Sequence, residues 1–236
     1  MKKVQKAKAG VPLLQPFSEL VRLLSHPDQW KRIAAAQSLG LRKDRTAIKP
    51  LVEKLNDPSP EVRLRILEVL GLLAKKGLPE IVNSLGDRNE LVRIQAIQAL
   101  EQIGDPAVKR KLWGCLNDIS GLVRSYAAGA IGRLGDRKDL SKLRLTLHKE
   151  RSPFARIGLL EALHNLGDDR QTTELLSLCR HSNYRVRCAA ANALGSLTLK
   201  PLTANEVVKE LKQLIRVDTS VAARESFLRA IKQIAS

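Results

Sequence analysis

The sequence predicts an all-α protein in which about seven antiparallel helix pairs stack on one another as an α-solenoid. One observation is a repeated phrase with apolar residues at helical spacing, as in EVRLRILEVLG, LVRIQAIQALE and RVRCAAANALG. The other is an arginine within this phrase that recurs at gaps of 31, 30, 31, 32, 31 and 37 residues: Arg32, Arg63, Arg93, Arg124, Arg156, Arg187 and Arg224. A persistent period of this length is typical of one supersecondary unit stacked on itself rather than of a single globular core.

Residues 1–15 are expected to form a flexible basic tail. They contain Lys2, Lys3, Lys6 and Lys8, a start that a secretory signal peptide would share. No adequate apolar stretch or small-residue cleavage site follows, so we do not predict a signal peptide. No apolar run in the sequence reaches the roughly 20 residues that a membrane-spanning helix needs.

The second repeat shows how each helix pair is read from the sequence. Residues 46–56 carry an apolar stripe that includes Leu51 and Leu55. The turn Asp57-Pro58-Ser59-Pro60 ends this helix, because proline disfavours the helical conformation of the preceding residue, and Pro60 suits the first turn of the next helix. Gly71 is expected to terminate that second helix.

The same pattern divides residues 16–236 into one solenoid domain of seven repeats. The last repeat follows a longer connection that contains Pro201. The repeats are expected at about 16–41, 46–74, 78–104, 106–135, 138–167, 170–197 and 204–235.

A second column of residues lies six positions before each of these arginines, in the turn between the paired helices. Five of its seven members are acidic: His26, Asp57, Asp87, Asp118, Glu150, His181 and Asp218. An acid at this position can cap the second helix, or it can accept hydrogen bonds from an arginine that is stacked one repeat away. We call the two columns together the ladder.

The acid–arginine offset, the period and the phrase D-x-x-x-x-V-R-x-x-A-A-x-A-L-G resemble HEAT repeats, most of all the short bacterial and phycobilisome-lyase-like variety. The resemblance covers nearly all of residues 16–236 and implies a right-handed superhelix. In that family the aspartate and arginine form a structural ladder. Asp57/Arg63, Asp87/Arg93, Asp118/Arg124 and Asp218/Arg224 match it fully, Glu150/Arg156 matches by charge, and His26/Arg32 and His181/Arg187 depart from it.

Seven aligned arginines could also form a track for phosphate groups. We favour the structural ladder, because most of these arginines have an acid at a fixed spacing. Charge-assisted hydrogen bonds of this kind contribute about 1.5–3 kcal/mol each when they are shielded from water.

The resemblance also implies that the second helix of each pair lines the concave face of the solenoid. Counting from the ladder arginine, positions −3, −2, +1, +2 and +5 are expected to be open, because +3, +4, +6 and +7 form the packed apolar columns. We call the open positions the second-helix face. The candidate binding residues on it are Trp30, Ile33, Leu64, Arg65, Leu91, Ile94, Gln95, Leu122, Tyr126, Phe154, Ile157, Tyr184 and Arg185.

Charge is expected to be separated from this face. The open positions carry fewer basic than acidic residues, so the net charge of +17 must lie in the tail, the outer helices and the loops. An apolar surface with aromatic anchors and little charge favours a protein or peptide partner. The function predicted first is therefore a non-catalytic protein-interaction scaffold or adaptor. The alternative for single residues is that they pack against neighbouring helices and belong to the core.

Nucleic-acid binding is the competing function, since a high pI with clustered basic residues is its electrostatic signature. The contacts would come from basic loops and the tail rather than from the concave face. The candidates are Lys43, Arg45, Lys75, Lys76, Lys109, Arg110, Lys111, Arg137 and Lys138. A solvated surface, or attraction to acidic partners and anionic membranes, would explain the same residues.

Catalytic motifs are missing from the sequence. It has no GxxxxGK[ST], GxGxxG or HExxH motif, and Cys115, Cys179 and Cys188 have no CxxC spacing. We therefore predict no enzyme activity, no cofactor and no metal, with the cysteines reduced in a cytoplasmic protein. A phycobilin-lyase-like or other accessory role is a lesser alternative that rests on repeat architecture alone. The sequence does not predict the oligomeric state.

Overall fold

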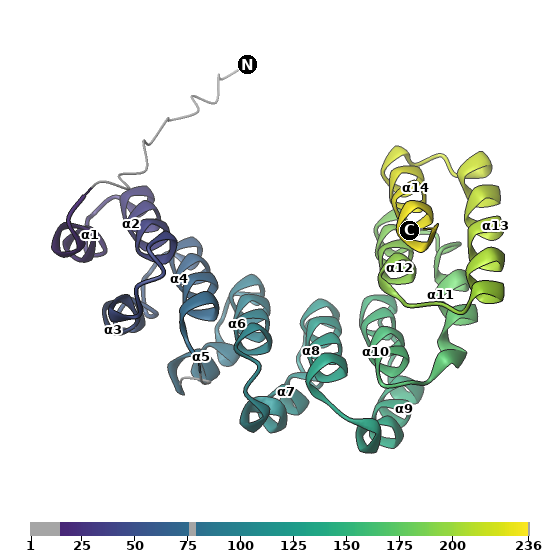
Figure 1. The fold of residues 1–236 in the computed structure, drawn as a ribbon, viewed down its shortest axis with the longest axis horizontal. Coiled ribbons are helices and arrows are strands. Elements are labelled where there is room, and N and C mark those ends of the chain that lie inside the picture. Colours follow the sequence, from purple (N-terminus) through teal and green to yellow (C-terminus); the bar gives the residue numbers. More distant parts are fainter. Residues whose placement is uncertain (1–14, 76–78, 236) are drawn as a thin grey trace. The chain divides into compact units, whose positions relative to one another are not determined.

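The computed structural model describes residues 15–75 and 79–235, and the chain folds as two compact units. Unit 1 comprises residues 1–108 and unit 2 residues 109–236. Fourteen α-helices and no strands occur in the described residues (Figure 1). The expected tail up to residue 14 and the candidate contact Lys76 lie outside them.

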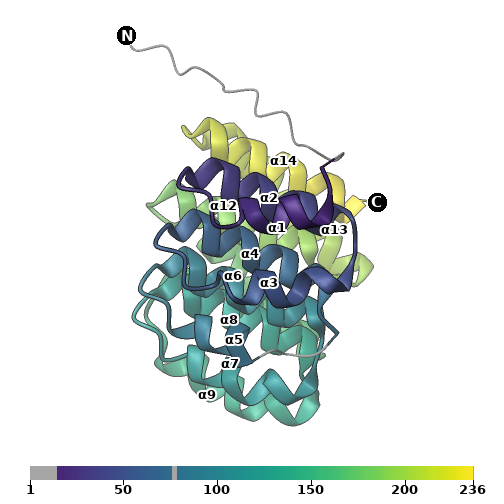
Figure 2. The same cartoon turned by 90° about the vertical axis from the view of Figure 1, so that its left-hand side faces the viewer.

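Unit 1 is a two-layer array of three helix pairs. The first helices of the pairs are α1 (Phe17–Leu23), α3 (Ile48–Val52) and α5 (Pro79–Asn83). The second helices are α2 (Gln29–Leu41), α4 (Pro60–Leu73) and α6 (Glu90–Ile103). Helix α4 packs between α2 and α6, and α1, α3 and α5 form the other layer (Figures 1 and 2).

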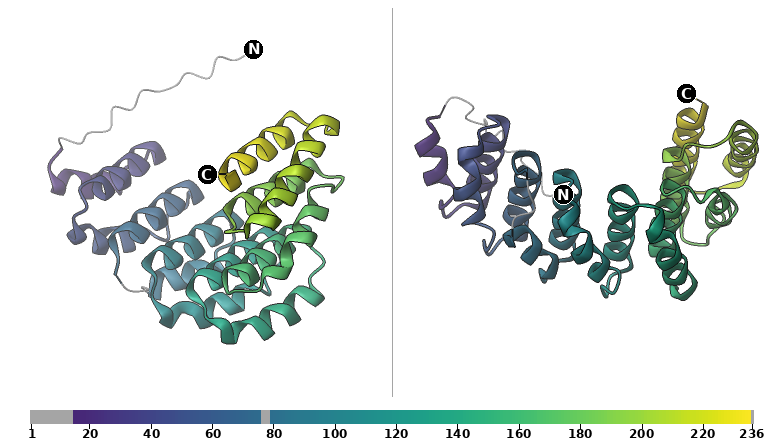
Figure 3. Two further views of the ribbon diagram at one scale, coloured as in Figure 1. Left: turned by 45° about the vertical axis from the view of Figure 1, so that its right-hand side comes forward. Right: turned by 60° about the horizontal axis from the view of Figure 1, so that its bottom comes forward.

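Unit 2 repeats this arrangement with four pairs. Its first helices are α7 (Lys109–Cys115), α9 (Leu140–Lys149), α11 (Thr172–Leu178) and α13 (Pro201–Val217). Its second helices are α8 (Gly121–Leu134), α10 (Pro153–Asn165), α12 (Tyr184–Ser196) and α14 (Val221–Ala235), and they pack in that order (Figure 3). Helix α13 begins at Pro201, so the expected connection there is the first turn of a helix, where proline needs no N–H partner.

Most second helices begin where a short polar side chain caps them, although Ser152 before α10 makes no capping hydrogen bond. Asp28, Asn89 and Asn183 each accept a hydrogen bond from a backbone N–H of the following first turn, as do the hydroxyl groups of Ser59 and Ser120. Five of the first helices are shorter than expected, because a short 3-10 helix precedes or follows each of them, such as Arg45–Ala47 before α3. The helix periodicity of the sequence does not distinguish these turns from α-helix. Helix α13 is longer than expected.

The glycine predicted to end the second helix of repeat two serves a different purpose. Helix α4 continues past Gly71 to Leu73, and a Cβ atom at Gly71 would lie 3.0 Å from the Cα atom of Ala99 in α6. Gly132 and Gly195 occupy the same position, +8, and a Cβ would lie 2.5 Å from Ala162 Cα and 3.0 Å from Ala230 Cα. The glycine at +8 therefore lets the next second helix approach closely.

The core of each unit lies between the two helix layers and between successive second helices. It consists almost entirely of leucine, alanine, isoleucine and valine, with Phe227 as the one aromatic side chain that is fully buried among the described residues. Small and branched aliphatic side chains allow this dense helix packing. Within the described residues, no helix has both the length and the apolar character needed to span a membrane.

Candidate functional site

In unit 1, ladder arginines join each helix pair to the next. Arg63 donates from Nε and Nη2 to the two carboxylate oxygens of Asp87, at 2.8 and 2.7 Å, and from Nη1 to the backbone carbonyl of Asp57 at 2.7 Å. Arg32 repeats this geometry with the carboxylate of Asp57 and the carbonyl of His26. Each arginine thus binds the backbone of its own turn and the acid of the following turn.

Unit 2 contains the same contacts. Arg124 donates two hydrogen bonds to Glu150, and Arg187 donates two to Asp218. Hydrogen bonds from Arg187 hold the pKa of Asp218 below its usual range, and those from Arg124 lower the pKa of Glu150. These acids are therefore charged at neutral pH and fix the register of neighbouring helix pairs.

The histidine at position 181 is compensated by an acid from a different element. His181 keeps the local contact of the acid column, because its Nδ1 accepts from the backbone N–H of Asn183 at 3.0 Å. It offers no carboxylate to Arg156, whose Nε binds Glu174 in α11 at 2.7 Å instead. Glu174 lies outside the periodic columns, so the sequence pattern does not reveal it.

The ladder arginines are largely unavailable to an external anion. Arg32 and Arg63 are 8% and 5% exposed, and Arg93 donates to the Asp87 carbonyl at 2.8 Å. Arg224 is half-buried, and its side chain makes no hydrogen bond or ion pair within residues 15–75 and 79–235. A continuous phosphate track along these arginines is therefore not supported.

Five of the thirteen candidates on the second-helix face are exposed. The exposed fractions are 62% for Trp30, 52% for Leu91, 43% for Tyr184 and 36% for Tyr126, and Arg185 is exposed beside Tyr184. Trp30, Leu91 and Arg185 occupy position −2, Tyr184 occupies −3 and Tyr126 occupies +2. Position −2 thus provides most of the exposed candidates on the second-helix face.

Other candidates on this face pack inside the protein. Ile94 and Ile157 are only 6% and 4% exposed, so their expected exposure was wrong. The reason is visible in unit 2, where a Cβ at Gly158 (position +2) would lie 2.3 Å from the carbonyl oxygen of Ser125 (position +1) in the neighbouring helix. In α8, position +1 therefore faces the next second helix of unit 2, α10. Phe154 packs against the core of unit 2. The remaining candidates are half-buried: Ile33, Leu64, Arg65, Gln95 and Leu122.

In unit 2 the basic candidates are partly neutralised. Lys109 forms an ion pair of 2.9 Å with Asp139. Arg110 and Lys111 on α7, and Arg137 and Lys138 in the turn before α9, are exposed and form no ion pair with another described residue. The Lys109–Asp139 pair joins the first turn of α7, with Arg110 and Lys111, to the turn with Arg137 and Lys138.

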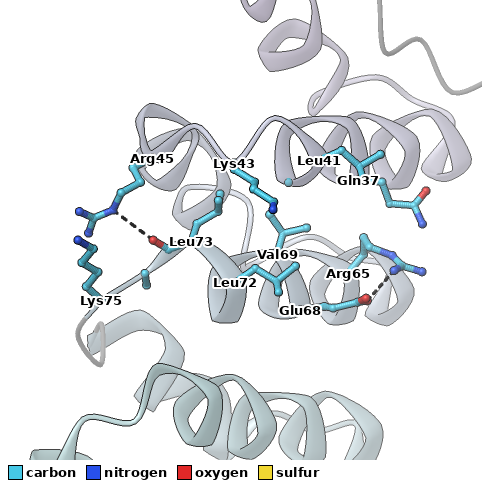
Figure 4. Close-up of a pocket in the computed structure, with 12 residues that line it drawn as sticks. Gln37, Leu41, Lys43, Arg45, Arg65, Glu68, Val69, Leu72, Leu73 and Lys75 are labelled. Carbon is cyan, nitrogen blue, oxygen red and sulfur yellow. Dashed lines mark hydrogen bonds and ion pairs between the residues drawn. The ribbon is translucent and has the colours of Figure 1, made fainter.

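In unit 1 a groove of about 760 Å³ lies between the C-terminal ends of α2 and α4 (Figure 4). Its apolar wall contains Leu41 and Leu72, which are 62% and 61% exposed, together with the buried side chains of Val69 and Leu73. Neither Leu41 nor Leu72 was predicted from the sequence as a binding residue. Both occupy position +9, where the repeats of unit 2 have polar side chains. The leucines at this otherwise polar position are the sequence signal that could have indicated the groove.

The groove brings together residues that were expected on separate surfaces. Lys43, Arg45 and Lys75 line it, as does Arg65 of the second-helix face, which pairs with Glu68 at 2.5 Å. Arg45 Nε donates to the carbonyl of Leu73 at 3.2 Å. The expected separation of charge from apolar surface is therefore wrong here, because the segments after α2 and α4 contribute their basic side chains to the lining of the groove.

The comparisons with known proteins identify the repeat. The sequence matches the family described as HEAT repeats over residues 17–80, 48–132, 78–164 and 140–232. The chain belongs to the HEAT-repeat family. A search of curated proteins gave no match.

Solved structures show the same HEAT-repeat fold. A chain in the structure of the complex of CpcE and CpcF of phycocyanin lyase from Nostoc sp. PCC7120 matches with a TM-score of 0.63 and 17% identity, and the match covers 99% of this chain and 100% of that chain. YibA of Escherichia coli matches with a TM-score of 0.57 and 19% identity, covering 100% of this chain and 98% of that chain. At these identities the likeness shows the fold alone.

The described residues of this HEAT-repeat protein contain few groups suited to catalysis. Within residues 15–75 and 79–235, no three His, Cys, Asp or Glu side chains lie close enough together to hold a metal ion. Burial raises the pKa of the Cys179 thiol to about 12, so this cysteine is not a thiolate at neutral pH. His164 Nε2 lies 3.1 Å from the carbonyl oxygen of Thr198, a contact that fits a structural role.

Proposed function

We propose that this HEAT-repeat protein is a non-catalytic scaffold or adaptor that binds a protein or peptide through its second helices. The observation that supports this most is the exposure of Trp30, Leu91, Tyr126 and Tyr184 at positions that the fold does not use for packing. Aromatic and leucine side chains of this kind are typical anchors of protein interfaces. Burying one of them in a partner contributes about 1.5–3 kcal/mol.

Affinity capture from native lysate tests this proposal. The bait is the full chain, compared with Trp30→Ala, Tyr184→Ala and the control Lys111→Glu. All three side chains are exposed, so the variants should fold. We expect a captured protein to be lost with at least one aromatic variant and retained with the control. Retention by both aromatic variants would contradict the assignment of the second-helix face.

A second candidate function is nucleic-acid binding through unit 2. The observation that favours it is the cluster of exposed, unpaired basic residues on two turns, Arg110 and Lys111 with Arg137 and Lys138. An electrophoretic shift assay on DNA and RNA at several salt concentrations tests it. Binding through this cluster should weaken steeply with salt and should be reduced by Lys111→Glu, the variant that leaves protein capture unchanged. No observation on the described residues favours a lyase-like role, and we do not propose one.

A further inference from the structure

The groove between α2 and α4 combines an apolar wall with an excess of positive charge. Four basic residues and one acid line it, and the acid, Glu68, is already paired with Arg65. Lys43, Arg45 and Lys75 make no ion pair within residues 15–75 and 79–235. The nearby Asp44 is occupied at its own turn, where its Oδ1 accepts from the backbone N–H of Thr46 at 2.9 Å. Within the described residues, these three basic side chains therefore have no ion-pair partner.

The corresponding turns of unit 2 provide a comparison within the same chain. There three basic side chains have acidic partners: Lys109 binds Asp139 at 2.9 Å, Arg144 binds Asp168 at 2.8 Å and Lys200 binds Asp169 at 2.7 Å. Arg110, Lys111, Arg137 and Lys138 have no such partner among the described residues, but no exposed leucine stands at position +9 beside them. Position +9, leucine at both walls of the groove, is arginine, asparagine and serine in α8, α10 and α12. Unpaired charge and an apolar wall therefore coincide in the groove and not at these turns of unit 2.

The backbone at Lys43 provides an independent observation. Lys43 has a φ of 54°, in the left-handed region that favours glycine, and its N–H closes the end of α2 on the carbonyl of Gly40 at 3.0 Å. A lysine at this position costs backbone energy that a glycine would avoid. Strained positions of this kind cluster at functional sites such as ligand-binding segments. Figure 4 shows the Lys43 side chain extending from this turn toward α4.

The polar groups are arranged along the groove in a definite order. Figure 4 shows Arg45 and Lys75 together at one end, Lys43, Val69 and Leu72 in the middle, and Leu41 opposite the Arg65–Glu68 pair at the other end. The bond from Arg45 Nε to Leu73 holds the guanidinium in place and leaves its two terminal nitrogens without a partner among the described residues. A ligand that fits this order has an aliphatic group followed by carboxylates.

We propose that the groove binds a segment of a partner protein in which an aliphatic side chain lies next to acidic residues. The aliphatic side chain would pack on Leu41 and Leu72, and the carboxylates would bind Lys43, Arg45 and Lys75. The volume of about 760 Å³ falls in the range of about 300–1,000 Å³ that is typical of binding pockets. This inference rests on the proposed function and specifies the chemistry of the partner for unit 1.

Selection from a random peptide library displayed on phage, with the full chain as target, tests the inference. We expect the selected peptides to combine Leu, Ile or Val with Asp or Glu. The strongest peptide is then synthesised with a fluorescent label, and its Kd is measured by fluorescence polarisation. Leu72→Asp and Lys75→Glu should each weaken binding by about tenfold or more, equivalent to about 1.4 kcal/mol. A version of the peptide with lysine in place of each acid should not bind.

Matched variants separate a direct contact from a general effect. Leu145→Asp alters a leucine of unit 2 that is 57% exposed, close to the 61% of Leu72, and Lys49→Glu reverses an exposed lysine of unit 1 outside the groove. Both should leave the Kd within about twofold, below the tenfold that corresponds to 1.4 kcal/mol. Lys43→Gly should weaken the peptide and at the same time raise the Tm, because it removes both a contact and the backbone strain. A change in folding alone does not produce that combination.

Several results would overturn the inference. They are the selection of basic peptides, the selection of no peptide, and a selected peptide whose Kd is unchanged by Leu72→Asp and Lys75→Glu. Dodecanoate serves as a probe for lipid binding. If it binds the groove and no acidic peptide is selected, the groove is a lipid site instead. A selected peptide that is lost with Tyr184→Ala but not with Leu72→Asp would overturn the groove and still support the proposed scaffold function.

Discussion

At the scale of single residues, the ladder shows how one guanidinium can join two helix pairs. The planar fork of arginine serves two acceptors at once, a carbonyl of its own turn and a carboxylate of the next. Lysine provides a single point charge and would lose one of these contacts. The arginine period is therefore a packing signal, although an isolated row of arginines would suggest an anion site.

The Arg187–Asp218 pair predicts a pH-dependent contribution to stability. Hydrogen bonds from Arg187 lower the folded-state pKa of Asp218, so the contribution is complete above the unfolded value of about 3.9 and is lost as the pH falls through the lower folded value. We expect Asp218→Asn to lower the free energy of unfolding by about 1.5–3 kcal/mol at pH 7. In urea denaturation this difference from the parent chain should shrink as the pH falls below about 4. A difference that stays constant with pH would show that the charge of Asp218 is not what stabilises the fold.

Arg156 pairs with Glu174 because position 181 has no acid, and this can be tested by placing an acid at position 181. Glu174→Ala should destabilise unit 2 by about 1 kcal/mol, a modest value because the Glu174 side chain is 34% exposed. His181→Asp in the same chain should recover most of that loss, since position 181 lies where the other rungs have their acid. Thermal unfolding of the single and double variants measures both effects. Glu174→Ala with His181→Ala is the matched control, and recovery there would argue against the ion pair.

At the scale of elements, the spacing between second helices depends on the small residues that face each other. A Cβ at Gly132 would lie 2.5 Å from the Cα of Ala162, and backbone cannot move aside as the end of a side chain can. Gly132→Ala should therefore lower the free energy of unfolding by about 1–3 kcal/mol. Gly114→Ala in α7 is the matched control, because a Cβ there meets no atom within 4 Å and alanine favours the helix by about 1 kcal/mol. Chemical denaturation should move the two variants in opposite directions, and equal effects would contradict a role for close helix approach.

The elements also show what sequence periodicity can and cannot predict. It predicted the fourteen helices, because the apolar columns and the Pro, Ser and Asn caps act within one repeat. It misread position +1 as open: Ile94 and Ile157 are buried, and Ile157 packs in a core cluster to which other helices of unit 2 contribute. It missed Glu174 and the groove for the same reason, because both depend on side chains that meet between repeats.

At the scale of the whole molecule, the net charge of +17 separates the two candidate functions by their response to salt. Binding of a partner by the exposed aromatic residues should change little with ionic strength. Nucleic acid bound through Arg110, Lys111, Arg137 and Lys138 should give a plot of log K against log salt concentration with a slope of about −3 to −4, and Lys111→Glu should reduce that slope by about 1. Shift assays between low and moderate salt measure the slope. A flat response would exclude these four residues as the nucleic-acid contact.

Each ladder arginine pairs with the acid of the following turn, and this limits how the number of repeats in such a chain can change. A duplicated segment of one full period, from Arg124 to Ala155, carries one donor and one acceptor, so inserting a copy would create a new rung and leave neither group without its partner. Gene duplication could therefore change the number of helix pairs in whole periods, whereas an insertion of half a period would separate each guanidinium from its carboxylate.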